Sequence, residues 1–183
     1  MTTSALMTVQ DLEQLPDDGY HYELIEGVLK RMPPPELPHG LVQQSLWLEL
    51  GNYVKQHGLG VAVGEVGFLL ETDPDTVLGP DIAVIPAEYL PISTEAGYER
   101  RVPPLVVEVL SPSNRRAEIE AKVAIYLRAG VRLVLVVNPR RRTVHVHTPD
   151  GKVHLLTEAD ELTGGDVLPG FRMPVANIFH WLT

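Results

Sequence analysis

The stretch PPLVVEVLSPSN, residues 103–114, decides the fold class. Apolar side chains occupy both faces of residues 105–110, as is typical of a strand buried in the middle of a sheet. Ser111-Pro112-Ser113-Asn114 then caps a helix that we predict from about residue 115 to residue 129, with Gly130 as its end. Residues 131–138 (VRLVLVVN) predict a second buried strand. This order predicts an α/β or α+β protein with a mixed sheet.

The segments before this stretch predict helices and strands in alternation. Thr8 is the expected N-cap of a short helix that ends near Pro16. Residues 20–32 predict a hairpin, with its turn at Glu26-Gly27. The prolines at positions 33, 34, 35 and 38 predict a stiff connector without regular structure. Further segments are a helix over residues 40–56 and strands over residues 61–70 and 81–86.

The segments after the stretch predict a second hairpin and an irregular tail. The hairpin covers residues 143–147 and 152–156, around the turn Pro149-Asp150-Gly151. The tail, residues 164–183, is interrupted by Gly and Pro and ends in an apolar cluster of Ile178, Phe179, Trp181 and Leu182.

Length and composition bound the class of protein. The chain has 183 residues, of which 44% are hydrophobic, so we expect one globular domain over residues 1–183. The absence of cysteine excludes disulfides, thiolate zinc sites and cysteine nucleophiles. We find no apolar run long enough to span a membrane and no signal peptide, which predicts a cytoplasmic protein without a membrane partner.

Charge is distributed unevenly along the chain. The formal net charge of −9 argues against a simple electrostatic binder of nucleic acid. Residues 100–142, however, hold ten basic and three acidic residues, a net charge of +7. Such a segment can meet a polyanion locally, although its arginines are equally compatible with solvated loops.

Two acidic residues lie within or at the start of predicted strands that are otherwise apolar. Glu108 lies inside LVVEVL, where an ionised carboxylate is costly unless it is paired or binds a cation. Asp81 begins an apolar strand directly after Pro80. Carboxylates from neighbouring strands can converge on one hard cation. The alternatives are a buried salt bridge to an arginine for Glu108 and a plain strand-start residue for Asp81.

Lys122, His39 and Glu23 are further candidates. Lys122 lies on or beside the apolar stripe of its predicted helix, although it can instead pair with Glu118, four residues earlier. His39 ends the proline connector, where a histidine serves either as a catalytic group or as a cap. Glu23 precedes a buried Leu-Ile pair, and we prefer it to Glu26 in the turn. We find no HExxH, GxxxxGK[ST], GxGxxG or GxSxG motif.

Several of these segments occur in an order that resembles a known family. They are YELIEG (22–27), PDIAVI (80–85), PPLVVEVLSPSN (103–114), Lys122-x-x-x-Tyr126, Gly130-Val131, Asn138-Pro139 and LPGF (168–171). Together they resemble the Uma-two family, which is similar to the PD-(D/E)XK nucleases. The resemblance covers about residues 8–180 and implies a restriction-endonuclease-like mixed central sheet flanked by helices, with added N-terminal and C-terminal hairpins.

The resemblance also implies a set of functional residues. Asp81 and Glu108 match the metal ligands, and Lys122 matches a lysine that the family supplies from the following helix. In the wider superfamily that lysine comes two residues after the glutamate, where this chain has Leu110. Glu23 and His39 match recurrent family positions. A second departure is the sequence after Gly130-Val131, where family members often have PEYW and this chain has RLVL.

From this resemblance we expect an Mg²⁺-dependent endonuclease that hydrolyses phosphodiester bonds of DNA, with Mn²⁺ able to substitute. Lys122 would position or activate the attacking water, and Arg115 and Arg116 would meet the charge of the DNA. We expect a homodimer and no organic cofactor. The alternatives are an inactive nuclease-fold protein that binds nucleic acid or a protein partner, and a structural homodimer.

Overall fold

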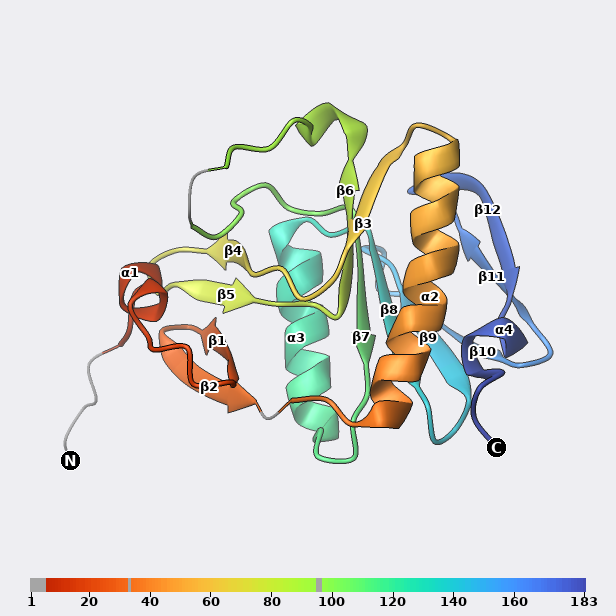
Figure 1. Ribbon diagram of the computed structural model, residues 1–183, viewed down its shortest axis with the longest axis horizontal. Helices are drawn as coiled ribbons and strands as arrows, with labels where there is room; N and C mark the ends of the chain where they lie inside the picture. The colour runs from red at the N-terminus through yellow and green to blue at the C-terminus, as the bar shows by residue number, and fades with distance from the viewer. Residues whose placement is uncertain (1–5, 33, 95–96) are drawn as a thin grey trace.

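The computed structural model describes residues 6–32, 34–94 and 97–183. A six-stranded mixed sheet lies at its centre, in the order β10-β9-β8-β7-β6-β3 (Figure 1). The strands are β3 (Gly60–Val63), β6 (Ile82–Pro86), β7 (Leu105–Val109), β8 (Leu133–Asn138), β9 (Thr143–His147) and β10 (Val153–Thr157). Strands β7 and β8 are parallel and the other neighbours are antiparallel. The predicted mixed sheet is confirmed.

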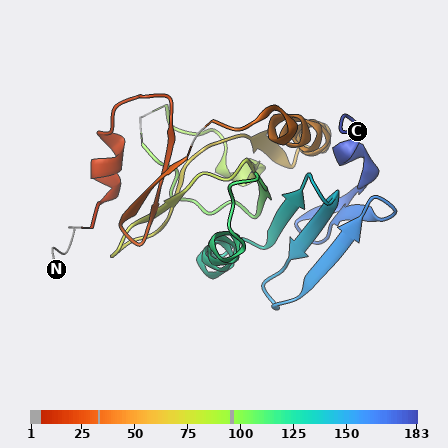
Figure 2. The same cartoon turned by 90° about the horizontal axis from the view of Figure 1, so that it is seen from below.

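A long helix covers each face of the central sheet. Helix α2 (Leu37–Gln56) packs on one face, and α3 (Arg116–Ala129) packs on the other as the crossover between β7 and β8. Figure 2, from below, shows the two helices on opposite sides of the strands. Gly130 ends α3 in the left-handed conformation, φ 109°, as predicted.

The prediction for the start of α2 is wrong. Pro38 does not keep its segment irregular, because it stands in the first turn of the helix, where its missing N–H needs no partner. His39 is therefore a residue of α2 and not the end of a connector. Pro33 of that connector and the first five residues of the chain lie outside the described residues.

A second, antiparallel sheet in the order β2-β1-β5-β4 lies beside the central one. Its strands are β1 (His21–Ile25), β2 (Val28–Met32), β4 (Phe68–Glu71) and β5 (Thr76–Leu78). The predicted hairpin of residues 20–32 is confirmed as β1 and β2. Helix α1 (Val9–Glu13) packs against β1, and Thr8 and Asp11 form its capping box as expected.

The single strand predicted over residues 61–70 is wrong. The structure divides it between β3 of the central sheet and β4 of the second sheet, and β5 follows. The intervening segment holds Gly64 and Gly67, and Glu65 there has a positive φ of 55°. A left-handed residue cannot continue a strand, so the chain turns from one sheet to the other at this point.

The C-terminal third extends the central sheet and adds a small hairpin. Strands β9 and β10 form the predicted second hairpin. The tail, residues 164–183, was expected to be irregular, but it contains β12 (Leu168–Pro174) and α4 (Ala176–Phe179). Strand β11 (Glu161–Gly164), directly before the tail, pairs with β12. Of the predicted apolar cluster, Ile178 and Phe179 are buried. Trp181, which was predicted to belong to it, is 65% exposed. A 3-10 helix, Ala87–Tyr89, follows β6.

Among the described residues, none of the helices combines the length and apolar character needed to cross a bilayer.

Candidate active site

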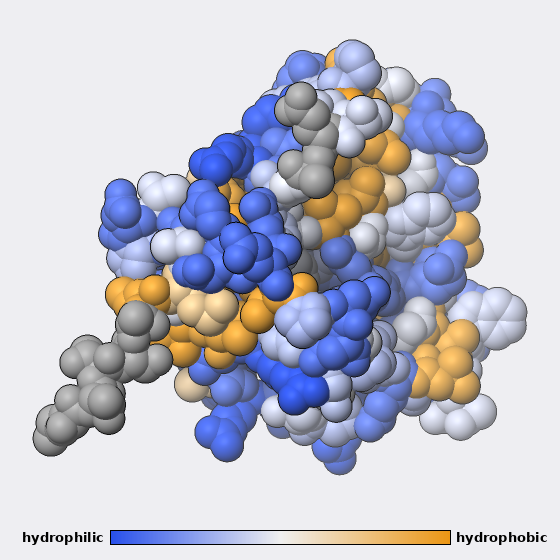
Figure 3. Space-filling view, turned by 60° about the vertical axis from the view of Figure 1, so that its left-hand side comes forward, coloured by the Kyte–Doolittle hydropathy of each residue, from blue (hydrophilic) through white to orange (hydrophobic). Residues whose placement is uncertain are grey.

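A cavity of about 800 Å³ lies where the second sheet and α1 meet the ends of β6 and β7. Its lining includes all five residues that the sequence selected as catalytic candidates. They are Glu23, His39, Asp81, Glu108 and Lys122. The space-filling view of the face on the α1 side of the molecule shows hydrophilic residues interrupted by several apolar patches (Figure 3).

Lys122 joins two carboxylates at the floor of the cavity. Its Nζ lies 2.8 Å from Oε1 of Glu23 and 3.3 Å from both carboxylate oxygens of Glu108. The Lys122 side chain is 12% exposed, and those of Glu23 and Glu108 are 2% and 8% exposed. The alternative pairing of Lys122 with Glu118 is wrong, because the Lys122 amine contacts Glu23 and Glu108. The Glu118 carboxylate accepts a hydrogen bond from the Arg115 N–H.

The alternation of β7 places Glu108 in this group. Val106, two residues earlier, packs under α3, so Glu108 points to the same face. On α3, Lys122 and Tyr126 are four residues apart and share a helix face. The Tyr126 hydroxyl donates a hydrogen bond of 2.6 Å to Glu108 Oε1. Glu108 thus has a lysine and a tyrosine as partners, and not the arginine considered from the sequence.

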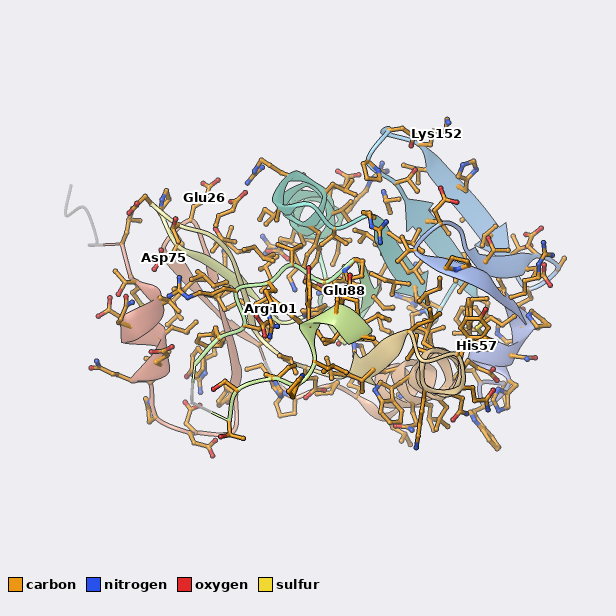
Figure 4. All side chains as sticks on the ribbon, turned by 90° about the horizontal axis from the view of Figure 1, so that it is seen from above. Glu26, His57, Asp75, Glu88, Arg101 and Lys152 are labelled. Carbon is orange, nitrogen blue, oxygen red and sulfur yellow. The ribbon has the colours of Figure 1, made fainter. Side chains whose placement is uncertain are left out.

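Glu23 reaches the cavity from β1. Its Oε1 also accepts a hydrogen bond of 3.0 Å from the Gly79 N–H, just after β5. Glu26 in the hairpin turn is exposed and lies at the rim of the molecule (Figure 4). The structure therefore brings Glu23, and not Glu26, to the other candidate residues.

Asp81 is held between α2 and β7. Its Oδ2 accepts a 2.5 Å hydrogen bond from the Val109 N–H, and its Oδ1 lies 3.3 Å from His39 Nε2. Gln43, one turn after His39, donates to the Asp81 main-chain oxygen at 2.8 Å. Because Val109 follows Glu108, these bonds fix Asp81 next to the Glu108 strand. The other ring nitrogen of His39, Nδ1, is buried and has no partner within the described structure.

The site holds more carboxylates than cationic side chains, and this excess of negative charge shifts the pKa values of its residues. Burial raises the pKa of Glu108 to about 7, and Asp81 and Glu23 add to the increase, although Lys122 opposes it. Burial lowers the pKa of Lys122, but the Glu108 and Glu23 carboxylates outweigh it and hold the pKa above its ordinary value. Lys122 therefore stays charged, while Glu108 takes up a proton far more readily than an ordinary glutamate.

The tyrosine and the histidine respond to the same charges. Burial, followed by the Glu108 charge, raises the pKa of Tyr126 well above its ordinary value, so its hydroxyl remains a donor. Burial lowers the pKa of His39, but the hydrogen bond and charge of Asp81 outweigh it, and the net direction is upward. A protonated His39 would balance part of the Asp81 charge.

The donor set fits a hard divalent cation. Asp81, directly before β6, and Glu108, in the neighbouring β7, offer carboxylate oxygens, and Lys122 is shared between Glu108 and Glu23. Two carboxylates together with waters are the usual protein contribution to an Mg²⁺ site. Within the part of the chain that the structure describes, no group of three or more His, Asp or Glu side chains is placed so that it could hold a metal ion by itself, so waters would have to complete the coordination.

Arg115 and Arg116 stay apart from this group. Arg115 precedes α3, and the Arg116 side chain is 91% exposed and pairs with Glu120 at 2.7 Å. Neither lines the cavity, although residues 111–114, immediately before them, do. From the sequence, Tyr126 was named only within the motif Lys122-x-x-x-Tyr126, and its contact with Glu108 was not predicted. The spacing of four between Lys122 and Tyr126 was the signal that both face Glu108.

The mixed sheet with a helix on each face and the polar cavity at its strand ends agree with the restriction-endonuclease-like class expected from the motifs. The Uma2 family model, described as "Putative restriction endonuclease", matches residues 9–176, and the chain belongs to this family. The resemblance expected from the motifs is thereby confirmed.

A solved structure supports the fold. The crystal structure of "a putative nuclease" from Anabaena variabilis ATCC 29413 matches with a TM-score of 0.84 and 20% sequence identity. The match covers 97% of this chain and 99% of the other. No curated protein matches the chain significantly.

Proposed function

We propose that the protein is a metal-dependent endonuclease that hydrolyses phosphodiester bonds of DNA, with Mg²⁺ as its metal and Mn²⁺ able to replace it. Family membership supports a nuclease. The observation that carries the proposal is the buried contact of Lys122 with Glu23 and Glu108, in one cavity with Asp81. Residues far apart in the sequence thereby form one charged group that is open to a ligand.

Each residue has a role in this proposal. Asp81 and Glu108 would hold the metal, which when bound lowers the pKa of water and polarises the phosphoryl oxygen. Lys122 would orient the attacking water and stabilise charge at the phosphate. Glu23 holds the Lys122 amine in place, and His39 and the Val109 N–H fix the rotamer of Asp81. Arg115 and Arg116 would meet DNA at the surface beyond the cavity.

Cleavage of labelled DNA in Mg²⁺ or Mn²⁺ tests the proposal. We expect activity in the parent and its loss in Asp81→Ala, Glu108→Ala and Lys122→Ala. Glu26→Gln is the matched control, because Glu26 lies on the same hairpin as Glu23 but outside the cavity. Cleavage by the three alanine variants at the parental rate would refute the assignment of these residues.

Metal binding separates the enzyme from a non-catalytic protein of the same fold. Calorimetric titration with Mn²⁺ should show binding to the parent and to Glu26→Gln, and none to Glu108→Ala. Bound metal also raises the melting temperature by mass action. An absence of binding at millimolar metal would favour a protein that uses the fold only to bind a partner.

Pairing of two copies belongs to the same proposal. Strand β10 is at the edge of the central sheet, and its Val153 and Leu155 side chains are 53% and 57% exposed. An apolar edge strand is a surface on which another strand can pair. Light scattering should give the mass of a dimer for the parent and of a monomer for Leu155→Lys. A parent that is monomeric at all concentrations would exclude this dimer.

A further inference from the structure

The wall of the cavity contributed by the β1–β2 hairpin carries an aromatic ring that the proposed chemistry does not use. Tyr20, directly before β1, lines the cavity and is 41% exposed. The guanidinium carbon of Arg31, from β2, lies 3.3 Å from the centre of the Tyr20 ring. Arg31 therefore covers one face of the ring, and the exposed remainder belongs to the cavity wall.

Asp18 organises this wall without any ligand. Its carboxylate accepts hydrogen bonds from the Tyr20 N–H at 3.2 Å and from the Tyr22 hydroxyl at 2.8 Å. Arg31 Nη2 lies 3.6 Å from the same carboxylate. One acid thus fixes the main chain at Tyr20, the Tyr22 hydroxyl and the arginine, and the Arg31 guanidinium stacked on the Tyr20 ring holds that ring in place before anything binds. A planar ligand that stacks on it has little ordering cost.

The position of the ring suits a group attached to a reacting phosphate. Tyr20 stands before β1, outside the alternation of that strand, and lines the same cavity as Glu23, which is three residues or roughly 10 Å of extended chain away. Glu23 contacts Lys122 at the cavity floor. A phosphate near Lys122 would therefore have an adjacent nucleotide within reach of Tyr20.

The size and charge of the cavity restrict which nucleic acid can enter. A volume of about 800 Å³ is within the range of a site for a small ligand, whereas the major groove alone of a duplex is about 12 Å wide. Lys122 is the single Lys or Arg among the described lining residues, and Glu13, Asp17, Glu36 and Glu65 are also in the lining. Neutralisation of many phosphates cannot supply the affinity here, so contact with a base has to.

We propose that Tyr20, backed by Arg31, stacks on an unpaired base, and that the cavity accepts single-stranded DNA, as a free end or a flap, and not continuous duplex. The inference rests on the proposed nuclease function and specifies its substrate. Base–aromatic stacking tolerates any base, so the preference is for strandedness and not for sequence. Tyr20 is a binding residue in this proposal and not part of the metal site.

Fluorescence anisotropy tests the proposal independently of cleavage. A short fluorescein-labelled single strand, the same strand annealed to its complement, and the RNA of the same sequence are titrated with the full chain in Ca²⁺ at fixed salt. Tyr20→Ala should weaken single-strand binding by about 5- to 150-fold, the range for loss of one stacked base. Tyr20→Phe, which keeps the ring, and Trp181→Ala, which removes a 65% exposed aromatic outside the cavity, should bind as the parent does.

The outcomes separate this inference from the nuclease proposal. Equal affinity of the parent for single strand and duplex, tighter binding of RNA, or parental affinity in Tyr20→Ala would overturn it, once circular dichroism has shown that the variant is folded. Single-strand binding that depends on Tyr20, without cleavage in Mg²⁺ or Mn²⁺, would support it and refute the nuclease. Cleavage of duplex as fast as of a flapped strand would overturn the substrate preference while leaving the nuclease intact.

Discussion

Two glutamates of this protein each contact a cationic side chain, but the pKa of one is lowered and the pKa of the other is raised. Glu99 accepts hydrogen bonds from Arg101 at 2.8 and 3.0 Å in a pair near the surface, and the Arg101 side chain is 41% exposed. The Arg101 hydrogen bond lowers the pKa of Glu99 to about 2. Glu108 contacts Lys122 in the cavity floor, and burial nevertheless raises its pKa to about 7.

The difference shows that a cation alone does not decide whether a carboxylate is ionised. Glu99 stays partly hydrated and has Arg101 as its charged partner, so the charged form is favoured. Glu108 has lost its water and shares Lys122 with Glu23 while Asp81 lies nearby. The free energy of desolvation and the repulsion between acids exceed the attraction of one lysine. Such a carboxylate gains most from a further cation, as a metal ligand should.

Removal of the two cations should give the largest contrast. We expect Lys122→Met to reduce the free energy of unfolding by about 3–5 kcal/mol, because it leaves buried carboxylates without a counter-ion. Arg101→Met should reduce it only slightly, because water screens the remaining charge of Glu99. Urea denaturation at neutral pH measures both. Recovery of stability in the double variant Lys122→Met with Glu108→Gln would confirm the cause, and equal losses in the two single variants would contradict it.

Loss of the tyrosine hydroxyl should have the next largest effect. Tyr126→Phe removes a 2.6 Å hydrogen bond to a buried carboxylate, which should cost about 1.5–3 kcal/mol of stability. The same bond favours the ionised form of Glu108, so the pKa of Glu108 should rise further in this variant. Tyr22→Phe is the matched control, since its hydroxyl binds the Asp18 carboxylate at an exposed site. NMR titration of the Glu108 carboxyl carbon should show the shift only in Tyr126→Phe.

Glu99 and Glu108 should each make the free energy of unfolding depend on pH, in two separate pH ranges. The folded pKa of Glu108 lies above its ordinary value of 4.5, so the native state binds the extra proton, and stability falls as pH rises from about 4.5 to about 7. The folded pKa of Glu99 lies below its ordinary value, so its contribution is lost as pH falls from 4.5 toward about 2. Urea midpoints across both windows should lose the first slope in Glu108→Gln and the second in Glu99→Gln. Unchanged slopes would contradict the assignments.

Salt should produce the smallest difference. Added KCl screens the exposed pairs, such as Arg116 with Glu120, and leaves the buried contact of Lys122 with Glu23 nearly unchanged. The stability difference between the parent and Lys122→Met should therefore be the same at low and high salt. A difference that shrinks as strongly as that of Arg101→Met would show that water reaches Lys122.

Much of this arrangement could be predicted from short-range sequence pattern. The apolar segments around Glu108 and after Pro80 predicted β7 and β6, because alternation and burial are local properties of a strand. Glu108 could be selected because burial of an ionised carboxylate inside LVVEVL costs free energy unless a partner compensates. Lys122 was selected because helical spacing placed it beside the buried stripe.

Other features depended on contacts that no local pattern contains. Residues 61–70 are divided between two sheets because β3 pairs with β6 and β4 pairs with β5. The start of α2 at Leu37 was obscured by prolines, since one of them is tolerated in a first helical turn. The β11–β12 hairpin was hidden by Gly and Pro in the tail.

Local sequence pattern was sufficient to predict the buried strands, the crossover helix, the family and three charged residues in apolar surroundings. Tertiary structure alone decided that Glu23 meets Lys122 across 99 residues of chain, that Tyr126 donates to Glu108, and that Tyr20 lines the same cavity. The physical reason is range: propensity and periodicity act over a few residues, whereas a cavity is defined by the packing of two sheets whose pairing the local pattern does not specify.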